Sequence, residues 1–264
     1  MITNEIDGKS KVYIMGDSAE ISKESQTNKI FKLVPVQAVV ALDRWALKFL
    51  DVKGTLANKY GSIYDSVSWS VDDSIPAPNA SFADQLHIIN KAKQFKIVVS
   101  IKRFSYEQFG LSEDLTYFAN EVTKIAKDID RDILQATKYS RWGIRIWYKI
   151  VDLTIEELVT KYYLGLNKNS ESIITTLKPE VAIIGFTGGI IKDNLKYNLF
   201  IGSGLTFKEG EEAQPIPNNE IVSIDMDCYR ENITGLTDLQ NTIQSSLLLS
   251  KSTCEQFINE VLNR

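Results

Sequence analysis

Two carboxylates stand two residues apart in a segment whose other positions are mostly apolar. In residues 221–229 (IVSIDMDCY), Asp225 and Asp227 alternate with Ile224, Met226 and Cys228. This period of two predicts a β-strand with both carboxylates on one face. Their Cα atoms would lie about 7 Å apart, close enough to share one divalent cation. The pair predicts either a metal site or, as is common for such carboxylates, ion pairs with neighbouring strands. Suitable basic partners are Lys102, Arg145 and Lys149.

The basic side chains come chiefly from a second alternating segment, residues 141–150 (RWGIRIWYKI). If both segments join one sheet, their apolar rows share one face and their charged rows share the other. We therefore predict a ligand-binding site of Arg145, Lys149, Asp225 and Asp227 on the polar face, with the basic pair on phosphate if the ligand is a nucleotide. The apolar row, which we expect in the core, is Trp142, Ile144, Ile146, Tyr148 and Ile150.

Other common catalytic arrangements lack the residues they need. His87 is the only histidine, in an apolar segment, so a structural role is expected and no Ser–His–acid or Cys–His arrangement can be built. The two cysteines, Cys228 and Cys254, predict buried, reduced thiols and no zinc site. The glycines of residues 185–189 and 202–204 lack the Lys-Ser/Thr of a phosphate loop and predict turns or bulges. We predict no catalytic residue and no cofactor, with Mg²⁺ or Mn²⁺ at Asp225 and Asp227 as the alternative.

Composition narrows the classes of partner. The 264 residues are 44% hydrophobic, enough for a sizeable core, and carry a net charge of −4 with a pI near 5.3. This charge argues against bulk affinity for nucleic acid or for an anionic membrane. No apolar run approaches the about 20 residues that span a bilayer, and the N-terminus lacks the pattern of a signal peptide. A cytoplasmic protein is expected.

The order of periodic segments predicts an α+β protein. Alternating strand patterns and long amphipathic helix patterns suggest a mostly antiparallel sheet packed by long helices, with two pseudo-repeated halves at about 30–166 and 178–264. Residues 1–29 are polar and predict a flexible N-terminal arm, and residues 30–264 predict a single domain. Residues 209–219 (EGEEAQPIPNN) predict an exposed acidic loop. Strands are expected over 34–42, 95–104, 141–150, 181–186, 195–207 and 220–229, and helices over 44–60, 112–137, 154–163 and 237–262.

The two strand motifs also resemble those of a sporadically distributed family of uncharacterised bacterial proteins. Arg141, Gly143 and Arg145 match an Arg-x-Gly-x-Arg-Tyr-x-Asn strand after a long helix, and residues 224–229 (IDMDCY) match a Leu-Asp-Ile-Asp-x-Tyr strand before a C-terminal helix. Trp147 and Lys149 depart from the family pattern. The likeness in order and spacing extends over about residues 31–264. It implies an α+β fold of mostly antiparallel strands covered by helices, and no activity. The patchy distribution suggests mobile defence or accessory gene clusters.

Two functions follow as hypotheses. The first is a non-catalytic interaction protein, a subunit or regulator of a bacterial multi-protein system, which the aromatic content of 10% suits. This hypothesis implies a protein partner and leaves self-association into a homo-oligomer open. The alternative is a metal-dependent enzyme or nucleotide-binding protein that uses Asp225 and Asp227.

Overall fold

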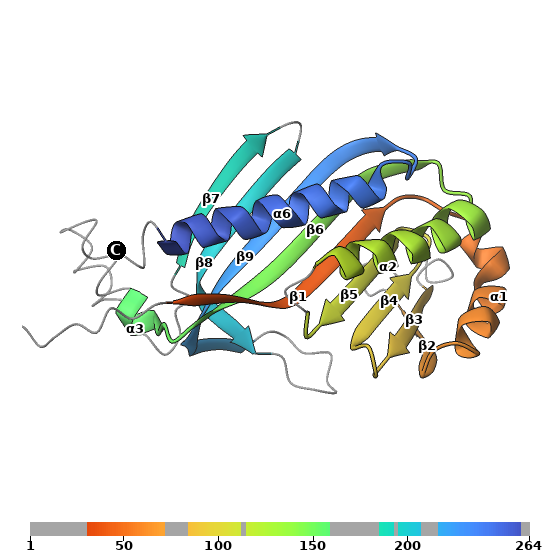
Figure 1. Ribbon diagram of the computed structural model, residues 1–264. Helices are drawn as coiled ribbons and strands as arrows, with labels where there is room; N and C mark the ends of the chain where they lie inside the picture. The colour runs from red at the N-terminus through yellow and green to blue at the C-terminus, as the bar shows by residue number, and fades with distance from the viewer. Residues whose placement is uncertain are drawn as a thin grey trace, which may run out of the picture.

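A single antiparallel sheet organises the protein. The computed structural model describes residues 31–71, 84–111, 115–158, 185–192, 195–206 and 216–259. Within these ranges nine strands form one sheet in the order β2-β3-β4-β5-β1-β6-β9-β8-β7, and every neighbouring pair is antiparallel (Figure 1). The fold is therefore α+β with a large antiparallel sheet, as the sequence predicts.

The strands follow the chain in two runs. In the first run are β1 (Lys32–Asp43), β2 (Ser66–Val71), β3 (Asp84–Asn90), β4 (Phe95–Val99) and β5 (Arg103–Phe109). In the second run are β6 (Lys138–Val151), β7 (Gly185–Lys192), β8 (Leu195–Thr206) and β9 (Ile216–Thr234).

The central strand β6 alternates as its sequence predicts. It pairs with β1 on one side and with β9 on the other. Its even-numbered residues from 142 to 150 are at most 3% exposed, whereas Arg145 and Lys149 are exposed. Branched and aromatic side chains on one side of the pleat fill the core, and the charged side chains stay in water.

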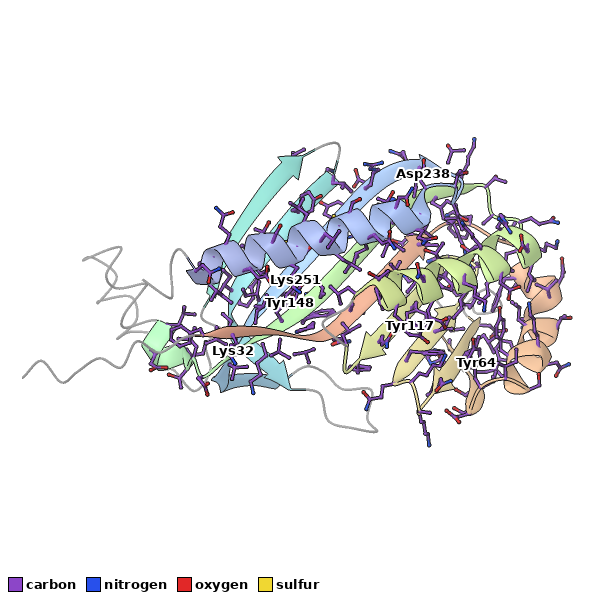
Figure 2. All side chains as sticks on the ribbon, viewed as in Figure 1. Lys32, Tyr64, Tyr117, Tyr148, Asp238 and Lys251 are labelled. Atoms are coloured by element: carbon purple, nitrogen blue, oxygen red, sulfur yellow. The ribbon has the colours of Figure 1, made fainter. Side chains whose placement is uncertain are left out.

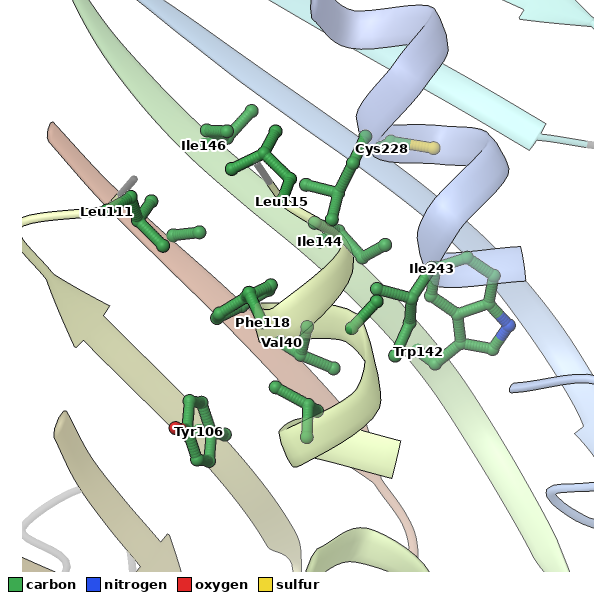
Figure 3. Packing of buried hydrophobic residues seen from close by; sticks show 14 of the residues in the cluster. Val40, Tyr106, Leu111, Leu115, Phe118, Trp142, Ile144, Ile146, Cys228 and Ile243 are labelled. Carbon is green, nitrogen blue, oxygen red and sulfur yellow. The ribbon is translucent and has the colours of Figure 1, made fainter. Parts of the chain in front are cut away.

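Helices cover the apolar face of the sheet. Among the described residues these are α1 (Phe49–Gly61), α2 (Thr116–Ala126) with its π-helical continuation η2 (Lys127–Ile133), and α6 (Leu239–Phe257). The short helix α3 (Ile155–Glu157) follows β6 and contacts β9. Figure 1 shows α2 and α6 side by side on one face of the sheet. Phe118 of α2 and Ile243 of α6 lie against Val40, Ile144 and the neighbouring strand residues (Figure 3).

The expected boundaries change at two turns. The predicted strand over 95–104 is two strands, because Ser100 N–H bonds to the Arg103 carbonyl at 2.8 Å and the Ser100 hydroxyl accepts the Lys102 and Arg103 N–H groups. The predicted helix over 44–60 begins only at Phe49. Arg44 and Ala46 instead donate N–H groups to the carbonyls of Lys102 and Ile101, both at 2.8 Å, and so prolong the β1–β5 ladder.

Other expectations fail for reasons that a single sequence hides. Strands β2 and β3 were not predicted. Residues 188 and 189, expected in a turn, lie within β7, and β9 begins at Ile216, inside the predicted loop 209–219. The pairing of β8 with β9 does shift register between Ser203 and Gly204, so the second glycine segment is a bulge. A pairing partner, which the segment itself does not contain, decides each of these cases.

Neither long helices nor pseudo-repeated halves are supported. The helix expected over 112–137 is α-helical only from Thr116 to Ala126, and the first run of strands has one more member than the second. The predicted arm 1–29 and residues 159–184, which include half of the predicted helix 154–163, lie outside the described residues. Among the helices that the structure describes, none is long and apolar enough to cross a membrane.

Candidate functional site

The candidate residues lie on the face of the sheet opposite α2 and α6. We call this side the polar face. The structure places Arg145 and Lys149 of β6 there, together with Asp225 and Asp227 of β9. By contrast Tyr148 lies beneath α6 (Figure 2). The other members are Arg141 and Trp147 of β6, Tyr229 and Glu231 of β9, and Lys196, Asn198 and Phe200 of β8, all partly or largely exposed.

Arg145 and Asp225 form a bidentate ion pair. Arg145 donates from Nε to Asp225 Oδ1 at 2.9 Å and from a terminal nitrogen to Oδ2 at 2.5 Å. The hydrogen bond to Asp225 raises the pKa of the Arg145 guanidinium. The guanidinium also lies 4.7 Å from the centre of the Trp147 ring. Planar Arg–carboxylate pairing fixes both side chains and leaves Asp225 little free capacity for a cation.

Arg141 binds the second carboxylate across Gly143. Its terminal nitrogen donates to Asp227 Oδ2 at 3.1 Å, although the residue directly opposite Asp227 in the ladder is Arg145. The side chain passes over Gly143, where an added Cβ would lie 3.7 Å from that nitrogen and 3.3 Å from Tyr229 Cβ. The guanidinium stacks 4.4 Å from the centre of the Tyr229 ring. Gly143 therefore leaves the space in which Arg141 reaches Asp227.

The electrostatics of Asp227 reflect partial burial. Burial raises the pKa of the Asp227 carboxyl, and the charges of Arg141 and Arg145 oppose this rise. The Asp227 side chain is 25% exposed and that of Asp225 is 13% exposed. Both carboxylates thus lie in the sheet surface, each beside an arginine.

Lys149 stands apart from this network. It lies opposite Ser223 of β9 and Val34 of β1, and it is exposed. Lys102, expected as a partner for the carboxylates, is instead in the turn between β4 and β5, with its ammonium 5.8 Å from the Trp45 ring centre. The two arginines and the two aspartates thus form the charge network around the candidate carboxylates, and Lys196 with Glu231, at 3.0 Å, is a further ion pair on the polar face.

A hollow of about 560 Å³ opens beside the ion pairs, over β7, β8 and β9. Its polar groups could accept and donate hydrogen bonds, and Phe200 adds an apolar wall. Among the described residues no three histidine, cysteine, aspartate or glutamate side chains are grouped to hold a metal ion. The lining residues are Arg145, Thr187, Gly189, Asn198, Leu199, Phe200, Asp225 and Asp227.

His87 lies on the same side of the sheet, toward the far edge. Its Nε2 is 2.8 Å from the Ser70 hydroxyl and 3.2 Å from the Gln85 side-chain oxygen. The imidazole thus lies within hydrogen-bonding distance of two polar side chains of the sheet.

The sequence predicts four of the site residues, but we did not predict that Arg141 reaches Asp227 across Gly143. The spacing Arg-x-Gly-x-Arg could have indicated this contact. It places a glycine between two arginines on one face of the strand, and the glycine leaves room for an arginine side chain to lie along the strand. No protein-family model and no curated protein matches the chain. The resemblance to the bacterial family therefore stays a prediction.

Proposed function

We propose that the protein is a non-catalytic interaction protein, a subunit or regulator of a bacterial multi-protein system, and that a protein partner binds its polar face. The observation that carries this proposal is the pairing of both candidate acids with arginines: Asp225 with Arg145 and Asp227 with Arg141. An acid held in this way is a poor base and a poor metal ligand. Arginine and aromatic side chains in mutual contact are, in turn, the residues enriched in protein–protein interfaces.

The arrangement of the polar face supports a protein partner in a second respect. Arg145 stacks on Trp147, and Arg141 and Lys196 both lie over Tyr229. These contacts hold the charged side chains in place before any partner binds, which lowers the entropy lost on association. The resemblance to a patchily distributed bacterial family adds the proposal that the multi-protein system belongs to defence.

The test uses the full chain, tagged, as bait in extract of its native host. Lys149→Glu reverses one exposed charge on the polar face, and Lys124→Glu makes the same change on α2, on the other side of the sheet. We expect Lys149→Glu to reduce recovery of a specific partner and Lys124→Glu to leave it unchanged, with equal melting temperatures. Equal recovery by both variants would overturn the proposal.

A second measurement addresses the enzyme or nucleotide-binding alternative. Titration calorimetry with Mg²⁺, Mn²⁺ and nucleotides on the wild-type protein and on the double variant Asp225→Asn, Asp227→Asn separates the two functions. The interaction proposal expects no metal-dependent heat in either protein. Heat that the double variant loses, at unchanged melting temperature, would favour the alternative.

A further inference from the structure

The loop between β1 and α1 displays two large apolar side chains to solvent. Trp45 is 68% exposed and Leu47 is 59% exposed, whereas their neighbours Arg44 and Ala46 are 2% and 5% exposed. A tryptophan held in water is unfavourable unless something covers it, and tryptophan is among the residues that dominate binding energy at interfaces. The loop thus has the character of a docking surface.

The buried residues of the loop, Arg44 and Ala46, anchor its backbone to the sheet. Arg44 donates to both carboxylate oxygens of Asp130 at 3.0 Å and to the Ser100 carbonyl at 2.6 Å, with the Arg44 and Asp130 side chains fully buried. Burial raises the pKa of the Asp130 carboxyl, and Arg44 opposes that rise. The two N–H groups of Arg44 and Ala46 that bond to the β4–β5 turn complete the anchoring. Trp45 and Leu47 therefore project from an anchored backbone, which lowers the backbone entropy lost on binding.

Two hollows flank Trp45, which lines both. One of about 690 Å³ lies toward the ends of β6 and β9, and one of about 440 Å³ lies toward β4 and β5. Among the described residues, the walls of the larger hollow contain Arg44, Lys48 and Lys138 and no acidic residue. The smaller hollow adds Lys102 and Arg103, and Asp43 is the one acidic residue among its described walls.

The ion pairs leave a net positive charge around Trp45. Arg44 is paired with Asp130, and Arg103 is paired with Asp43 at 2.7 Å. Three lysines of the walls can then pair with negative charges of another molecule: Lys48, Lys102 and Lys138. A chain with net charge −4 thus concentrates positive charge around an exposed tryptophan.

We propose that Trp45 and its two hollows form a docking site for an acidic segment of a partner protein that also carries bulky apolar side chains. Carboxylates of the segment pair with the three lysines, and an apolar side chain packs on Trp45 in each hollow, in contact with Leu47 as well in the larger one. The chain's overall negative charge favours a protein segment over a nucleic acid, whose long-range repulsion would extend beyond this patch. This site is separate from the polar-face network of Arg141, Arg145, Asp225 and Asp227.

The test measures binding of fluorescein-labelled probes to the full chain by polarisation. The probes are a peptide of alternating glutamate and leucine, a peptide of alternating lysine and leucine, and a single-stranded oligonucleotide. We expect the acidic peptide to bind, with an affinity that falls as salt rises, and the other two to bind at least about tenfold more weakly. Equal binding of the basic peptide, stronger binding of the oligonucleotide, or no binding of the acidic peptide would overturn the proposal.

Variants locate the binding. Trp45→Ala and Lys102→Glu should each weaken the acidic peptide by about tenfold or more, because one removes the apolar anchor and the other reverses a wall charge. Lys124→Glu on α2 is the matched control, and Lys149→Glu tests independence from the polar face. Both should leave peptide affinity unchanged, with all four melting temperatures close to wild type. Undiminished affinity in Trp45→Ala would place the peptide elsewhere, whereas weakening by Lys149→Glu alone would assign it to the polar face.

Discussion

Single residues on the polar face carry out distinct physical tasks. Gly143 supplies space for Arg141, Arg141 and Arg145 neutralise the aspartates, and Tyr229 supports a guanidinium. None of these tasks follows from residue type alone, since each depends on what lies across the ladder. Changes at single positions therefore test whether the network is built as described.

Filling the space above Gly143 should destabilise the protein. The Cβ of any replacement would meet Tyr229 Cβ at 3.3 Å, and the methyl groups of Gly143→Val would also displace the Arg141 guanidinium. We expect a loss of about 1–3 kcal/mol for Gly143→Val, typical of overpacking, and a smaller loss for Gly143→Ala. Urea denaturation followed by circular dichroism measures both. A valine variant as stable as wild type would mean that Arg141 does not pass over this position.

Glu107 should make stability depend on pH. Its carboxyl accepts a hydrogen bond from Gln37, and burial raises its pKa above the ordinary 4.5 despite Lys96 and Gln37. Because the folded state holds this proton more tightly than the unfolded chain, the carboxyl stabilises the fold below pH 4.5. That contribution is lost as the pH rises through the folded pKa. Glu107→Gln, which keeps an acceptor without a charge, should melt higher than wild type at pH 7 and equally below pH 4.5. An advantage that is largest at acidic pH would contradict this sign.

At the scale of elements, some strands are determined by their own sequence, and others depend on the strand with which they pair. Strand β6 has a strict alternation that fixes its inner and outer rows. The edge strand β2 (SVSWSV) alternates serine with apolar residues just as strictly, yet Trp69 and Val71 are 47% and 60% exposed, so its alternation does not fix a buried row. Helix α1 is intermediate, since its core positions are apolar but its interior contains Gly54.

Replacing Gly54 should strengthen α1. An added Cβ at Gly54 meets no atom within 4 Å, and the backbone is helical, so alanine is accommodated without strain. We expect Gly54→Ala to stabilise the protein by about 0.5–1 kcal/mol, because alanine loses less backbone entropy in a helix. Thermal melting measures the gain. Gly110→Ala serves as the contrasting change, since Gly110 has a φ of 59° and its Cβ would collide with Gln94.

At the scale of the whole molecule, one core beneath α2 and α6 holds both runs of strands together. Residues of β1, β4, β5, β6 and β9 belong to the same buried cluster, with Phe118 and Ile243 contributed by the helices (Figure 3). The opposite face keeps its charges in the surface as ion pairs. The fold thus separates a structural face from a face available for binding.

A charge placed in this core should prevent folding. Ile146 is fully buried on β6, and Ile146→Asp would put an unpaired carboxylate among apolar side chains. We expect a loss of more than about 4 kcal/mol, seen as an unfolded or aggregated product. Lys149→Asp is the control, because it places the same side chain three residues away on the polar face. A folded Ile146→Asp protein with wild-type melting temperature would be incompatible with the inner row described above.

The sequence determined by itself the alternation of β6 and β9, the buried row of β6, the common side of the two aspartates and the α+β class. These follow from side-chain period, which is a local property. The tertiary structure decided which cation each carboxylate meets: Arg141 and Arg145, and not Lys102. It also decided that residues 44–48 are a loop presenting Trp45, because the Arg44–Asp130 pair joins positions 86 residues apart. Contacts between distant segments have no local signature, so the pattern of Trp45 and Leu47 could predict a helix while the fold placed both side chains in water.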